Sequence, residues 1–84
     1  MHELLGTAHA EGLGALRQAA AESAANPAAA LELTAAPALV TALRTDPLAL
    51  AQFAARAGRS IALREDRLMP LSGWRLRPMP RSTA

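Results

Sequence analysis

The fold of this chain is decided by residues 31–77, which read LELTAAPALVTALRTDPLALAQFAARAGRSIALREDRLMPLSGWRLR. The start and the end of this stretch alternate apolar and polar residues, which is typical of strands. Its middle instead has the three- and four-residue apolar spacing of helices. The order of these patterns predicts a β-α-α-β-β unit.

Residue types at the helix ends mark the two helices in the middle. Pro37 fits the first turn of a helix that should stop by residue 44 or 45. A second helix begins at Asp46-Pro47, because the aspartate accepts from a free amide of the first turn and proline has no amide to leave unpaired. Gly58 follows that helix at the position of a left-handed cap.

Residues 31–34, 60–64 and 74–77 are the predicted strands. We expect the last two to be antiparallel neighbours and the first to pair with either of them. The predicted fold class is therefore α+β, with a small, largely antiparallel three-stranded sheet and helices on one face. The expected core anchors are Leu39, Leu43, Leu50, Phe53, Ile61, Leu63, Trp74 and Leu76.

The remaining residues divide into an N-terminal helix, a connector and a tail. Residues 1–24 predict an amphipathic helix, residues 25–30 a connector around Asn26-Pro27, residues 31–78 the small domain, and residues 79–84 a tail. Gly6, Gly12 and Gly14 each cost this helix about 1 kcal/mol relative to alanine. Its first half should therefore fray unless it packs on something.

Composition predicts a thin core in a reducing compartment. The 84 residues are 51% hydrophobic but mostly alanine, which removes little surface from water. A partner subunit or the rest of a longer polypeptide would supply more apolar surface. The absence of cysteine favours the cytoplasm, and the absence of a long apolar run excludes a transmembrane helix.

The sign of the charge changes along the chain near Arg56. All nine basic residues are arginine, and seven of them lie between residue 56 and the C-terminus. A basic C-terminal third suits nucleic acid or an acidic protein surface.

Arg64, Arg75 and Arg77 are the candidate RNA-binding residues. The period of two puts Arg75 and Arg77 on one face of the last strand, and Arg64 joins them if the strand register allows. Guanidinium groups in a row pair with successive phosphates, although alternating arginine also keeps an exposed strand soluble. Trp74 is interpreted as a core or interface anchor in preference to a stacking surface.

No catalytic or metal site is predicted. Glu65 and Asp66 are neighbours in a strand and would point to opposite faces, so we interpret them as turn residues. His2 and His9 lack a third ligand. Two function classes remain open: an RNA-related accessory domain, and a free-standing protein-protein interaction module without RNA binding.

An ordered set of short motifs covers nearly the whole chain. It resembles the C-terminal end of ribonuclease E/G family proteins, in particular their short alanine- and arginine-rich bacterial members. The motifs are ELLG at 3–6, LTAAPALV at 33–40, the segment from Leu50 through Phe53 to RAGR at 56–59, IALRED at 61–66 and GWRL at 73–76.

This resemblance implies a non-catalytic accessory subdomain of an endoribonuclease of RNA processing and decay. Such a subdomain would contribute packing, oligomer contacts or weak RNA docking, and its partners would be the rest of the polypeptide, another copy of the chain, or RNA. In that family the catalytic aspartates and their Mg²⁺ belong to an upstream domain. No position here matches those acids or the family's zinc-linking cysteine pair, so we expect no cofactor and no activity alone. A start at Met1 inside the resemblance suggests a truncated gene, a fragment or a separately encoded remnant.

Overall fold

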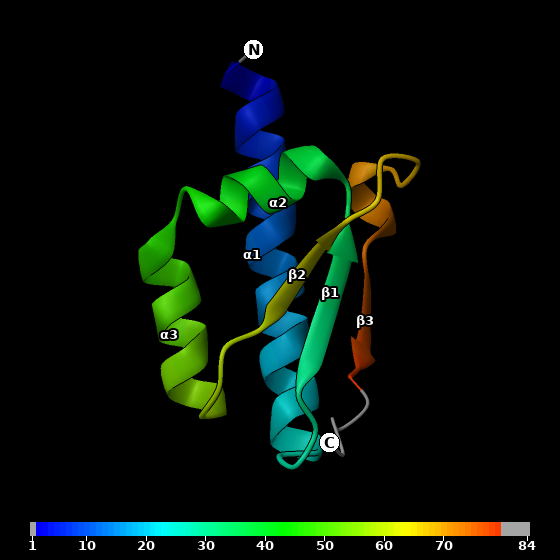
Figure 1. Ribbon diagram of the computed structural model, residues 1–84. Helices are drawn as coiled ribbons and strands as arrows, with labels where there is room; N and C mark the ends of the chain where they lie inside the picture. Colours follow the sequence, from blue (N-terminus) through cyan, green and yellow to red (C-terminus); the bar gives the residue numbers. More distant parts are fainter. Residues whose placement is uncertain (1, 80–84) are drawn as a thin grey trace.

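Within residues 2–79, three helices lie on one side of a three-stranded sheet (Figure 1). The computed structural model describes the backbone of residues 2–79 and the side chains of residues 6–79. The α+β class and the helical layer on one face are confirmed. The elements are α1 His2–Ala25, β1 Leu31–Ala35, α2 Pro37–Arg44, α3 Pro47–Ala57, β2 Ala62–Glu65, the short 3₁₀ helix η1 Leu71–Gly73 and β3 Arg75–Pro78.

The sheet has the order β2-β1-β3, with β1 in the centre. β1 pairs with β2 in parallel and with β3 antiparallel, so that Leu33 lies opposite both Leu63 and Leu76. The sheet is thus mixed, and the expectation that the last two strands are neighbours is wrong. They occupy its opposite edges.

The connections explain this order. Strands that pair in parallel need a long crossover, and α2 and α3 form it between β1 and β2. The loop after β2 then passes the end of β1, where the amide of Asp66 donates to the carbonyl oxygen of Ala35 at 2.8 Å. Through η1 the chain reaches the free side of β1. The most buried strand thereby has both of its edges paired.

The core lies between β1 and the helices. Leu31, Leu33 and Ala35 are buried at alternate positions of β1. Of the expected anchors, Leu39, Leu43 and Phe53 are buried. The other five are partly buried and pack against the same cluster; they are Leu50, Ile61, Leu63, Trp74 and Leu76.

Helix α1 belongs to this core along most of its length. It contacts α2, α3, β1 and η1, and it buries Ala15, Leu16 and Ala19 in the same cluster as β1. In Figure 1 it runs behind the sheet. The N-terminal helix and residues 31–78 therefore form one packed unit. Of the expected tail, Met79 is exposed and residues 80–84 lie outside the described residues.

A glycine in α1 allows α2 to approach closely. A methyl group built at Gly12 would lie 2.8 Å from Cδ2 and 2.9 Å from Cγ of Leu43. Leu43 is fully buried, so its side chain has little room to move away. The glycine that weakens the isolated helix is thus the point where the second helix crosses it.

We expect Gly12→Ala to destabilise the protein although alanine is the better helix former. Overpacking a tight contact costs about 1 to 3 kcal/mol, more than the roughly 1 kcal/mol of helix propensity gained. Gly14→Ala is the matched control, because its added carbon would meet only an arginine nitrogen at 3.7 Å. Urea unfolding followed by circular dichroism should rank the variants Gly14→Ala above wild type above Gly12→Ala; a stabilised Gly12→Ala would show that α1 and α2 are packed loosely.

The start of α3 is formed as predicted and is also tied to α1. Asp46 Oδ1 accepts from the amide of Ala49 at 3.1 Å, and Pro47 follows at the first helical position. Its other oxygen, Oδ2, lies 2.7 Å from Nε2 of His9. The helix ends at Gly58, whose φ of 78° is the left-handed conformation expected there. One carboxylate therefore caps α3 and connects it to the first helix.

These contacts stabilise the charged form of Asp46. The hydrogen bond to His9, and then the one from the Ala49 amide, hold the pKa of the carboxyl below its usual 3.8. Because the folded-state pKa lies below the unfolded one, this contribution to stability is complete above pH 3.8 and is lost as the pH falls through the folded value.

Asp46→Asn should make the stability of the protein depend less on pH in the acidic range. Asparagine caps a helix as well as aspartate does, so the substitution removes mainly the titrating charge. We expect the melting temperature of the wild type to fall more steeply than that of the variant between about pH 5 and pH 2. If the melting temperatures of the two proteins fell equally with pH across this range, a role for the Asp46 charge would be excluded.

Candidate nucleic-acid interface

The face of the sheet that is turned away from the helices carries the predicted arginines. Because Leu31, Leu33 and Ala35 point to the core, Glu32 and Thr34 point outward. In the register of the sheet, Thr34 lies between Arg64 on β2 and Arg75 on β3. The neighbouring row on the same face, two residues along β1, contains Ala62, Glu32 and Arg77. All three predicted arginines are thus on one face.

Strand geometry sets the spacing of these cations. Neighbouring strands lie about 4.8 Å apart, so the backbones of Arg64 and Arg75 are separated by about 10 Å across β1. Arg75 and Arg77 are two residues apart on β3, or about 7 Å. All three side chains are exposed. The arginines therefore form a triangle on the sheet, with Thr34 between two of its corners.

One of the three arginines has an acidic partner. Arg77 Nε donates to Oε1 of Glu32 at 3.1 Å, and the glutamate side chain is only 16% exposed against 65% for the arginine. For Arg64 and Arg75 no ion pair is formed within the described part of the chain. Glu65, at the end of β2, is bound instead to Arg44 of α2 at 3.2 Å. Arg64 and Arg75 are the cations with the most freedom to bind an anion.

A fourth arginine, which the strand pattern of the sequence does not indicate, lies beside the same face. Arg67 lines a hollow of about 580 Å³ together with Thr34, Arg64, Arg75 and Arg77, and Glu65 and Asp66 line the same hollow. It lies in the loop between β2 and η1, where periodicity assigns no face. The only signal in the sequence was its position directly after Glu65-Asp66.

The loop that carries Arg67 is held by Asp66. Its Oδ1 accepts from the amide of Leu68 at 3.0 Å, and its carbonyl oxygen accepts from the amide of Met69 at 3.1 Å. This is the turn role expected for that aspartate. The turn leaves Leu68 95% exposed at the edge of the hollow.

Of the two histidines considered as metal ligands, only His9 has a described side chain. Within residues 6–79 no three His, Cys, Asp or Glu side chains are grouped closely enough to hold an ion. His9 is bound to Asp46, and the side chain of His2 lies outside those described.

Aromatic side chains do not contribute to this surface. Trp74 packs against the core, and its Nε1 donates to Oε1 of Glu11 on α1 at 3.0 Å. Phe53 is buried. Of the residue types that bind nucleic acid, the open face presents cations and the Thr34 hydroxyl, without a ring on which a base could stack.

Among the described residues, no helix combines the length and the apolar character needed to cross a bilayer. Comparisons with models of protein families, with curated proteins and with solved structures find no match to this chain.

Proposed function

We propose that this chain is a non-catalytic RNA-binding module whose open sheet face docks on the phosphate backbone. The observation that carries the proposal is the common face of Arg64, Arg75 and Arg77, with Arg67 beside them. Guanidinium groups match phosphate oxygens in geometry and charge. The face carries these arginines together with Glu32 and has no aromatic platform, which suits backbone contacts and not base recognition.

RNA is the proposed nucleic acid because of the sequence resemblance. The motifs at residues 33–40, 56–59, 61–66 and 73–76 resemble the C-terminal end of ribonuclease E/G proteins. In that setting the module would hold RNA near a catalytic domain on the same polypeptide or in the same assembly. Its own contribution would be affinity and orientation, with no step of the cleavage reaction.

Binding of this kind should depend on salt and be indifferent to sequence. Each phosphate that an arginine neutralises on a single strand releases counterions and contributes about −0.7 to the slope of log K against log salt. Three or four arginines thus predict a slope of about −2 to −3.

Arg64→Ala with Arg75→Ala should weaken RNA binding while leaving the fold intact, because both side chains are exposed. Exposed ion pairs contribute up to about 1 kcal/mol each, so we expect a loss on the order of fivefold to tenfold. The salt slope should become shallower by about 1.4. Titration of fluorescently labelled single-stranded RNA at several salt concentrations measures both quantities.

Arg17→Ala with Arg56→Ala is the matched control for this pair. It removes the same charge from the helical side of the molecule, where both arginines are exposed. It should change the affinity by less than about twofold. Equal weakening by the two pairs would mean that net charge, and not the sheet face, binds RNA. No binding by the wild type at low salt would favour the alternative, an interaction module without RNA.

Glu32→Gln should strengthen RNA binding. The substitution removes the one carboxylate in the middle of the face and releases Arg77 from its ion pair. We expect affinity to rise about twofold to fivefold at low salt, with a steeper salt slope. The same titration tests this, and unchanged affinity would indicate that Arg77 does not contact the RNA.

A further inference from the structure

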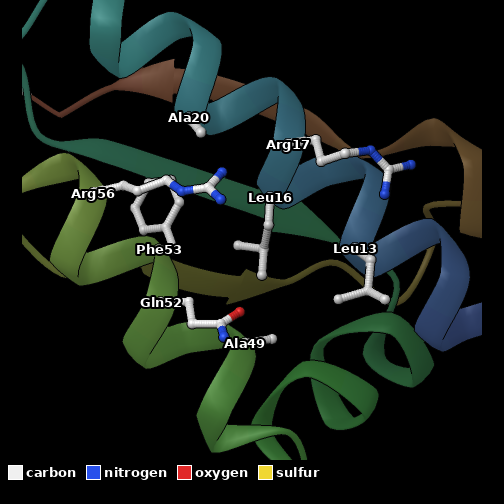
Figure 2. Close-up of a pocket in the computed structure, with 8 residues that line it drawn as sticks. All are labelled: Leu13, Leu16, Arg17, Ala20, Ala49, Gln52, Phe53 and Arg56. Carbon is white, nitrogen blue, oxygen red and sulfur yellow. The ribbon is translucent and has the colours of Figure 1, made fainter.

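A groove runs between α1 and α3 on the helical side of the molecule (Figure 2). A first hollow of about 160 Å³ is lined by Leu13, Leu16, Ala20, Ala49 and Phe53, among others. A second, of about 330 Å³, continues along the same two helices towards Pro27. Ala20 and Arg56 line both hollows, so the two form one groove.

The floor of the groove is apolar and its rim is basic. Leu16 and Phe53 are 6% and 5% exposed, and the alanines beside them keep the groove open. Arg17 stands on the α1 side and Arg56 on the α3 side (Figure 2). Both are exposed and form no ion pair within the described residues. Among the described residues, no acidic side chain lines either hollow.

The spacing of the lining residues fits a helical occupant. The lining residues of each helix are related by steps of three or four positions; they are residues 13, 16, 17, 20, 23 and 24 of α1 and residues 49, 52, 53, 56 and 57 of α3. Two such stripes side by side form the kind of groove into which an amphipathic helix lays its apolar face. From residue 13 to residue 24 the α1 stripe is about 16 Å long, or three helical turns.

The hollow at Phe53 has room for one large side chain. Its volume is close to that of cavities of about 150 Å³ that hold a benzene ring. A leucine or phenylalanine of the occupant would fill it and cover Leu16 and Phe53. The charges at the rim require carboxylates beside that residue.

Within the described side chains of residues 6–79, a second copy of the chain does not supply such a helix. The exposed positions of α2 and α3 include Thr41, Arg44, Leu48 and Arg56 but no acidic residue. On α1, Glu11 is bound to Trp74 and Glu22 is only partly exposed, so that the fully exposed positions between residues 6 and 25 carry no carboxylate. The described helices are therefore not complementary to the groove.

We propose that the α1–α3 groove binds an acidic amphipathic helix of a partner protein, with an apolar residue in the hollow at Phe53 and carboxylates paired with Arg17 and Arg56. This surface lies on the helical side, with the strands behind it in Figure 2, and is separate from the arginines of the open sheet face. The chain can thereby hold a protein and an RNA at the same time.

The test uses the full chain and a labelled helical peptide of about 15 residues, enough for the three turns of the groove with its ends. The probe carries leucines along one face and glutamates on both sides of them; a second probe has lysines in place of the glutamates. Fluorescence anisotropy at moderate salt should show saturable binding of the acidic probe, with the lysine probe at least about tenfold weaker.

Two variants assign the binding to the groove. Arg17→Glu with Arg56→Glu reverses the charge of the rim, and Ala20→Phe fills the floor without changing charge. Each should weaken the acidic probe at least about tenfold. Arg64→Glu with Arg75→Glu is the control with the same change of charge on the sheet face, and it should change the affinity less than about twofold. Circular dichroism checks that every variant is folded.

The proposal is overturned if the acidic probe does not bind, if both probes bind equally, or if the two charge reversals have equal effects. It is also overturned if RNA displaces the probe and Arg17→Glu with Arg56→Glu abolishes RNA binding, because the groove would then belong to a nucleic-acid surface. If RNA binding is lost only in the variant Arg64→Glu with Arg75→Glu, the result assigns RNA binding to the sheet face and agrees with a separate groove.

Discussion

The alternation of side chains along β1 is the constraint on which the rest of this structure depends. β1 is paired on both edges, and its residues at odd positions are buried against the helices. Since the period of a strand is two, burial of Leu33 assigns Thr34 to the opposite face, together with the residues opposite it on β2 and β3. A slip of one residue would turn Leu63 or Leu76 outward and bring an arginine into the core. Core packing and the candidate interface are thus two consequences of one register.

Local chemistry explains which parts of the fold could be predicted from the sequence. Asp46-Pro47 and Gly58 act within one turn of α3, and both do in the structure what their residue types predict. Strand order is a non-local property. The patterns at residues 60–64 and 74–77 do not say which edge of β1 each strand takes, and a hairpin between them satisfied the same alternation. In the structure the loop after β2 passes the end of β1, so that β3 pairs with the free edge of β1 and not with β2.

The two proposed surfaces also differ in how far the sequence predicts them. The strand period of two is sufficient to place Arg75 and Arg77 on one face of the sheet. The register of the strands places Arg64 on the same face. Arg67 lies in a loop, where no period assigns a face, and the α1–α3 groove depends on how two helices pack together, which the period of each helix does not determine. Gly12 illustrates the difference: in the sequence it is a weak point of a helix, whereas in the structure it is a contact with Leu43. The carboxylates of Glu11, Glu32, Asp46 and Glu65 are all engaged in joining elements. Arg64 and Arg75 on the sheet face and Arg17 and Arg56 at the groove form no ion pair within the described residues.

The position of β3 has a consequence for the order of events during synthesis. The sheet is closed by the last described element, and the amide of Met79 donates to the carbonyl oxygen of Ala30, just before β1, at 2.7 Å. Residues about 45 apart in the chain must meet before that edge of β1 is covered. The central strand therefore leaves the ribosome long before its second partner, with one row of amides and carbonyls unpaired in the meantime. Folding of this unit is complete only after residue 79 has emerged. Until then the unpaired edge of β1 can pair with another chain or be covered by a chaperone.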